Sequence, residues 1–145
     1  MRRTGLVLVI GLLTGCGGSG GPHLSEAAYQ QRGAAVCGRY EKAIHALGEP
    51  TAVAQLGPYI TRAMPILGRT VTQLGAIHPP QARAGDFGRY LAAARATLAR
   101  AHALRAAAAK ADGAAVERLL KDAAKASGPR AALAQKAGLP ACALD

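Results

Sequence analysis

The sequence predicts an all-α protein, folded as an antiparallel up-down four-helix bundle with kinked helices. Half of the 145 residues are hydrophobic, and much of that half is alanine, which has the highest helix propensity. Aromatic residues make up only 3% of the chain, and β-branched residues are also sparse, which disfavours a sheet protein. Apolar residues recur at steps of three and four along four segments with short connections, a pattern typical of bundles.

The first predicted helix occupies residues 25–47, and the second lies within residues 51–77. Ser25 is a suitable N-cap for the first helix, whose apolar stripe ends before a Gly-Glu-Pro break. In the second helix, Pro58 is interpreted as a first-turn residue. Pro65 lies further along, where it removes a backbone hydrogen bond and predicts a kink.

The third and fourth helices follow further Pro- and Gly-rich breaks. The third is expected over residues 80–110, after a His-Pro-Pro break. The fourth starts near Gly113, with Asp112 as its N-cap. We expect this helix to break or kink at residues 127–129, a Ser-Gly-Pro sequence, and to end near Gly138.

The N-terminal segment differs in character from the rest of the chain. Two arginines precede an apolar run over residues 6–13, which is far shorter than the roughly 20 residues that a membrane-spanning helix needs. Small residues follow it, as at a signal-peptide cleavage site. The predicted organisation is therefore a signal peptide at 1–15, a Gly-rich tether at 16–23 and a helical bundle domain at 24–145.

The four residues Leu13-Thr14-Gly15-Cys16 resemble the lipobox of bacterial lipoproteins. This resemblance implies cleavage between Gly15 and Cys16, a diacylglyceryl group on the Cys16 sulfur, and a protein anchored at the extracytoplasmic face of a bacterial membrane. Two or more lipid chains anchor firmly, whereas one chain binds only weakly. The alternative interpretation is an ordinary secretory signal followed by a chance cysteine.

The mature part also resembles a known group of proteins. Residues 79–110 and the sequence Gly138-Leu139-Pro140-Ala141-Cys142 are similar to small alanine-rich lipoproteins of high-GC actinobacteria. Those proteins pair an alanine-rich helical domain with a lone C-terminal cysteine. The resemblance implies a cellular location and a fold, and no activity is known for these proteins.

Lipidation of Cys16 leaves two further cysteines, Cys37 and Cys142. Exported proteins meet an oxidising environment, so this even pair is expected to form a disulfide. Closing a loop of about 105 residues would stabilise the fold by up to roughly 4.7 kcal/mol in the chain-entropy model. The alternatives are a buried free Cys37 with a frayed Cys142 and, less favoured, a metal site, for which no CxxC spacing exists.

The chain is strongly basic, with a formal net charge of +10. Removal of residues 1–15 leaves 16 Lys and Arg residues against 8 Asp and Glu residues. Such a balance suggests anionic partners, although a merely solvated cationic face explains the same composition. The candidate contacts to an anionic surface are the arginines of the third helix, Arg83, Arg89, Arg95, Arg100 and Arg105. They wrap around the helix, which disfavours nucleic acid because that partner calls for a clustered face.

The sequence contains no catalytic constellation, no cofactor motif and no convincing metal site. Glu41 and His45 share a helix face, but no Glu-x-x-His motif accompanies them, so we interpret them as an ion pair. We therefore expect a membrane-anchored, non-enzymatic module that binds anionic lipid, an envelope polymer or a partner protein, with no cofactor. The alternative is a basic cytosolic protein associated with nucleic acid, which requires that the leader is not processed.

Overall fold

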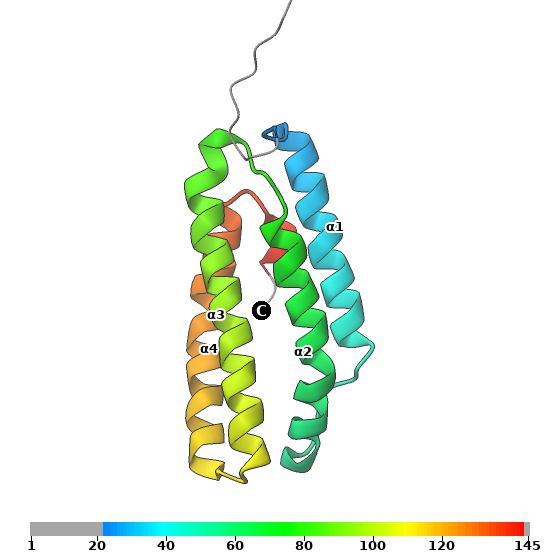
Figure 1. Cartoon of the computed structure of the whole chain (residues 1–145), viewed down its shortest axis with the longest axis vertical. Coiled ribbons are helices and arrows are strands. Elements are labelled where there is room, and N and C mark those ends of the chain that lie inside the picture. The colour runs from blue at the N-terminus through cyan, green and yellow to red at the C-terminus, as the bar shows by residue number, and fades with distance from the viewer. Residues whose placement is uncertain (1–21, 144–145) are drawn as a thin grey trace, which may run out of the picture.

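The computed structural model describes residues 22–143, which contain four α-helices. These helices lie along one axis (Figure 1). No strand occurs within these residues, so the predicted all-α class is confirmed. The elements in chain order are α1 (Glu26–His45), α2 (Val53–Gly75), the 3-10 turn η1 (Gln81–Arg83), α3 (Ala84–Ala109), α4 (Gly113–Lys136) and the 3-10 turn η2 (Pro140–Cys142).

The helix boundaries follow local side-chain chemistry. The Ser25 hydroxyl accepts a hydrogen bond from the Ala28 amide at 3.3 Å, and Asp112 Oδ1 accepts one from the Ala115 amide at 2.9 Å. Both predicted N-caps are confirmed, because each satisfies an amide that lacks an intrahelical partner. After α4, Gly138 adopts a φ of +77°, a conformation that glycine reaches without steric cost.

The expectation for Pro58 is wrong, and so is one of the two alternatives for residues 127–129. α2 begins at Val53, so Pro58 lies in its second turn and not in its first. Of the break or kink expected at residues 127–129, the break does not occur, because α4 continues through Pro129 to Lys136, and the kink stays a prediction. Pro129 is exposed, so its ring meets solvent and not a neighbouring helix, and the Ser127 hydroxyl donates to the Ala124 carbonyl within the same turn.

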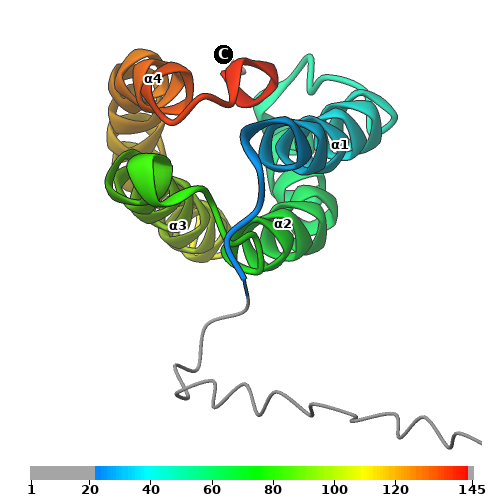
Figure 2. The ribbon, with the colours of Figure 1, turned by 90° about the horizontal axis from the view of Figure 1, so that it is seen from above.

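Each helix packs against its neighbour in sequence, whereas the backbones of α1 and α4 stay apart. The short turn η2 contacts both of these helices and lies between them, as the view from above shows (Figure 2). In a closed bundle α1 and α4 would contact each other directly. Here the turn η2 lies between them and contacts both.

The main core lies at the end of the bundle where α1 begins. Its centre is Tyr29, which is fully buried, packs edge-on against Phe87 with ring centroids 5.8 Å apart, and donates a hydrogen bond to the Ala137 carbonyl at 2.8 Å. Leu139, the residue just before η2, is 1% exposed and packs into this core. The buried members of the cluster are Tyr29, Val36, Cys37, Leu74, Ile77, Phe87, Tyr90, Leu91, Ala134, Ala137, Leu139 and Cys142.

A disulfide joins Cys37 of α1 to Cys142 of η2, with the two Cα atoms 5.2 Å apart. The predicted pairing is confirmed. Both cysteines are buried in the core cluster, so the bond fastens the C-terminal turn to α1 from inside.

The segment that precedes α1 is also held at this end. The Leu24 amide donates to the His78 carbonyl at 3.1 Å, and His23 Nδ1 lies 2.6 Å from the Pro79 carbonyl. The connection between α2 and α3 therefore fixes the point at which the chain enters the bundle. Cys16, the predicted signal peptide and most of the predicted tether lie outside the described residues.

Candidate functional site

The five arginines predicted as anionic-surface contacts do not come together. Arg83 pairs with Glu26, at 3.1 Å between Nε and Oε1, and Arg89 pairs with Asp86 one turn earlier on α3. Arg100 is half-buried and donates to the Thr97 hydroxyl at 3.2 Å. The other two, Arg95 and Arg105, are exposed.

A denser group of cations lies on the other pair of helices, along the groove between α1 and α2. Arg39 and Lys42 of α1 and Arg69 of α2 are exposed and line a hollow of about 460 Å³. Apolar side chains form much of its floor. We call this the α1–α2 groove, and its lining residues are Val36, Arg39, Tyr40, Lys42, Ala43, Ala46, Ile66, Arg69, Thr70 and Gln73.

Two further basic residues lie on the same helix faces as the cations that line the α1–α2 groove. Arg32 lies seven residues before Arg39, and Arg62 lies seven residues before Arg69, so each continues the same helix face. Both are exposed. The two facing stripes therefore carry five basic residues, with apolar residues between them.

No carboxylate neutralises the α1–α2 groove within the described part of the chain. The sequence has no Asp or Glu between Glu49 and Asp86, so α2 carries none. The nearest polar link is an amide, since Arg39 Nη2 donates to Gln73 Oε1 across the groove at 3.1 Å. Ion pairs within residues 22–143 join Glu41 to His45, Glu26 to Arg83, Asp86 to Arg89 and Glu117 to Lys121.

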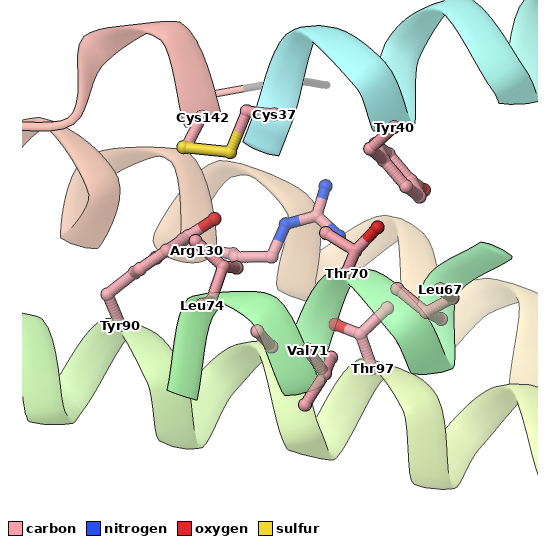
Figure 3. A pocket seen from close by; sticks show the side chains of 11 residues that line it. Cys37, Tyr40, Leu67, Thr70, Val71, Leu74, Tyr90, Thr97, Arg130 and Cys142 are labelled. Carbon is pink, nitrogen blue, oxygen red and sulfur yellow. A yellow bond between two sulfur atoms is a disulfide. The ribbon is translucent and has the colours of Figure 1, made fainter. Parts of the chain in front are cut away.

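A second, smaller hollow lies inside the bundle next to the disulfide (Figure 3). In that view the Arg130 side chain extends from α4 into the space between Tyr40, Thr70 and Tyr90. The volume of this hollow is about 40 Å³. Since one water needs about 10–15 Å³, it has room for a few waters but not for a substrate. Its lining residues are Cys37, Tyr40, Leu67, Thr70, Val71, Leu74, Tyr90, Ala94, Thr97, Arg130 and Cys142.

The tyrosines around this interior hollow are hard to deprotonate. Burial raises the pKa of both Tyr40 and Tyr90, and the positive charge of Arg130 opposes the rise in each case. Both phenols therefore stay protonated at neutral pH and act as hydrogen-bonding groups. Neither is activated as a nucleophile or general base in this environment.

The described residues offer neither a metal cluster nor a membrane-spanning helix. Glu41 and His45 approach to 3.9 Å on the exposed side of α1, and no third His, Cys, Asp or Glu joins them or any other such pair within residues 22–143. Over the same range, no helix is both long enough and apolar enough to cross a bilayer.

Comparison with protein-family models found no match, and comparisons with curated proteins and with solved structures found none either. Function must therefore be inferred from the geometry and charge of this chain.

The α1–α2 groove was missed by sequence reasoning, which took the helix with the most arginines as the basic face. The signal that would have found it is an absence of acids. Arg62 and Arg69 are far in sequence from any Asp or Glu, whereas Arg83 and Arg89 each pair with a carboxylate.

Proposed function

We propose that this chain is a bacterial lipoprotein, cleaved between Gly15 and Cys16, lipid-anchored through Cys16 and folded on the extracytoplasmic face of a membrane. Its bundle acts without catalysis, by binding anionic groups of the envelope, either lipid headgroups or an acidic polymer. The lipobox-like leader supports the proposed lipid anchoring and the extracytoplasmic location. The α1–α2 groove supports the binding chemistry.

The observation that carries the binding proposal is the grouping of Arg39, Lys42 and Arg69 around an apolar floor, with no carboxylate in the lining that residues 22–143 provide. Uncompensated cations on one face create a positive potential that attracts anionic surfaces. Each basic residue held close to an anionic membrane contributes about 1 kcal/mol. The arginines that already pair with Glu26 and Asp86 contribute less, because their charge is partly neutralised.

The position of the predicted tether is compatible with this contact. The chain takes eight residue steps from Cys16 to Leu24, where it is held to the bundle, and these steps reach at most roughly 27 Å. Arg39 lies 13 residues into α1, which is about 20 Å along the helix axis. A lipid-anchored bundle could therefore lie along the membrane with the α1–α2 groove against it.

We also propose that the bundle has the antiparallel up-down topology, with a kink at Pro65. The short connections over residues 46–52, 76–83 and 110–112 favour antiparallel neighbours. The colour gradient in Figure 1 runs downwards along α1 and α3 and upwards along α2 and α4, which supports the same topology. The kink is supported by the missing backbone N–H of a proline inside α2.

The proposed cleavage and lipidation are tested by mass spectrometry of the protein isolated from its host. We expect the mature N-terminus to be an acylated Cys16. An intact Met1 in the native host would refute the lipoprotein proposal. It would favour the cytosolic nucleic-acid-associated alternative, which fractionation would then check.

The binding chemistry is tested with residues 16–145 carrying Cys16→Ser, so that no lipid assists. Binding to neutral phosphatidylcholine vesicles is compared with binding to vesicles containing phosphatidylglycerol, at low and high salt. Soluble polyglutamate serves as the polymer arm. We expect binding to the anionic probes only, and a loss at high salt because exposed charges are screened over about 8 Å at physiological ionic strength.

A matched pair of variants locates the contact. The triple variant Arg39→Gln, Lys42→Gln, Arg69→Gln should lose affinity on the order of a hundredfold at low salt. The control triple Arg95→Gln, Arg118→Gln, Lys125→Gln removes the same charge from exposed positions on α3 and α4. Equal losses in the two triples would show diffuse attraction and contradict a site at the groove.

A further inference from the structure

The inward face of α4 is incompletely covered in the half of the bundle farthest from η2. α4 packs against α3 and η2, while neither α1 nor α2 approaches its backbone. As a result Leu119 is only half-buried, and Ala123, one turn further along the same face, is exposed. A helix face left open in this way provides a cavity between α4 and its one long neighbour.

That cavity lies between α3 and α4 and has a volume of about 200 Å³. Its two ends differ in chemistry, because hydroxyl and guanidinium groups line one end and only apolar side chains line the other. We call it the α3–α4 trough. Its lining residues are Thr97, Arg100, Ala101, Leu104, Leu119, Ala123, Ala126, Ser127 and Arg130.

The polar end of the α3–α4 trough carries an unsatisfied donor. Arg100 Nη2 donates to the Thr97 hydroxyl at 3.2 Å, but its Nε is buried and has no hydrogen-bond partner within the described residues. A buried donor without a partner is costly, so an acceptor at this place is favoured. Arg130 adds a second guanidinium, and Thr97 and Ser127 add two hydroxyls whose protons are donated to the Ala93 and Ala124 carbonyls. Among residues 22–143, no carboxylate lines the trough.

The apolar end leads toward a larger hollow at the far end of the bundle, of about 580 Å³, lined in part by Leu56, Ala108 and Val116. Ala108 lies one turn beyond Leu104 on α3, and Val116 lies one turn before Leu119 on α4, so the two cavities follow the same pair of helix faces. From Arg100 to Ala108 the path along α3 is about 12 Å.

We propose that the α3–α4 trough binds a single-chain amphiphile with an anionic head, such as a fatty-acid carboxylate. The head accepts a hydrogen bond from the unsatisfied Nε of Arg100 and lies beside the side chains of Thr97 and Ser127. The acyl chain lies between α3 and α4, over Leu104 and Leu119, and ends in the distal hollow. This combination of an apolar cavity with a few convergent polar groups is characteristic of small-molecule sites.

The experiment measures binding of dodecanoate by calorimetry, below its micelle concentration, to residues 16–145 carrying Cys16→Ser. Dodecyl maltoside is the probe with a chain and no charge, and acetate is the probe with a charge and no chain. We expect dodecanoate to bind and both other probes to bind at least tenfold more weakly. Equal binding of dodecyl maltoside or of acetate would overturn the proposal.

Variants test the two ends separately. Arg100→Gln should weaken dodecanoate binding about tenfold or more, whereas Arg95→Gln, on the exposed side of the same helix, should change it less than about twofold. Ala123→Gln should obstruct the chain, while its exposed neighbour Ala124→Gln should not. Melting curves identify any variant that fails to fold, and Ala123→Gln then decides the outcome, since it adds a side chain at an exposed position.

This inference does not depend on the proposed function, because the trough and the α1–α2 groove share no residue. The triple variant of the groove should lose binding to anionic vesicles and keep binding to dodecanoate. Loss of dodecanoate binding in that folded variant would overturn the assignment to the trough.

Discussion

The phenol of Tyr29 connects three parts of the chain that are distant in sequence. Its ring belongs to α1 and packs against Phe87 of α3, while its hydroxyl donates to the carbonyl of Ala137, just after α4. Burial is the largest cause of the rise in its pKa to about 12, and the negative charge of Glu26 adds to it. The folded protein therefore favours the protonated phenol strongly.

This preference predicts a loss of stability at alkaline pH. In the unfolded chain the phenol ionises near pH 10, so its stabilising contribution is complete below that value and is lost as pH rises from 10 to 12. Across this window the slope is at most about 1.4 kcal/mol per pH unit. Urea unfolding of the wild type and of Tyr29→Phe between pH 8 and 12 measures it. The variant should show a shallower decline, and parallel curves would contradict the assignment.

Gly33 is required by the fold because α1 and the C-terminal turn approach each other there. A Cβ at this position would come too close to the Leu139 Cδ2 atom, and the Leu139 side chain is itself fully packed. Gly33→Ala should therefore destabilise the protein by about 1–3 kcal/mol, although alanine has the better helix propensity. Chemical denaturation measures the change.

Gly38 is the matched control, since it lies on the same helix and a Cβ added there would meet nothing within 4 Å. Gly38→Ala should stabilise the protein by up to about 1 kcal/mol. A stabilising Gly33→Ala would mean that Leu139 moves aside without cost, against the packing described above.

At the scale of elements, the sequence predicted the helices well and their interruptions poorly. Ser25 and Asp112 indicated two helix starts by their side chains, because capping is a local interaction. The prolines were harder to interpret, because their effect depends on which side of the helix they face. Pro129 is exposed, so α4 tolerates it, and no single sequence reveals that orientation before the packing is known.

The candidate site was less predictable than the helices. The pairing of Cys37 with Cys142 followed from counting cysteines, which needs no geometry. Which cations remain available depends on tertiary contacts, as Arg83 illustrates by pairing with Glu26, 57 residues away in sequence. The unsatisfied Arg100 Nε likewise depends on burial, which periodicity alone did not reveal on a helix with arginines all around it.

The turn η2 joins α1 and α4, and the disulfide holds it in place, so removal of this bond should have large effects. The double variant Cys37→Ser, Cys142→Ser should lose up to about 4.7 kcal/mol of stability, since the bond closes a loop of 105 residues. Thermal melts with and without reductant measure the loss. Reductant should lower the melting temperature of the wild type and leave that of the double variant unchanged. A shift in both would point to another cause.

For the whole molecule, the distribution of the core is uneven. The end that holds Tyr29 and the disulfide contains the continuous buried cluster, and the leading segment of the chain is fixed there by the backbone bond from Leu24 to His78. In the other half, Ile60, Met64 and Ala107 are buried, but Leu120 is 41% exposed and both the α3–α4 trough and the distal hollow lie open. The continuous core thus lies at one end, and the proposed amphiphile site runs from Thr97 and Arg130, which also line the hollow beside the disulfide, toward the other end.

This asymmetry predicts two levels of hydrogen-exchange protection within one helix. α3 runs through both halves, with Gly85 and Gly88 near its start and most of its alanines in residues 92–109. Local helix propensity therefore favours the distal half, so stronger protection at the start of α3 would have to come from tertiary packing. Amides near Phe87 and Tyr90 should exchange only through global unfolding, whereas amides over residues 103–109 should exchange faster through partial opening of the distal half. Exchange measured residue by residue by NMR tests this. Equal protection along α3 would show that the open cavities do not weaken the distal half, because a helix that unfolds as one unit protects all of its amides alike.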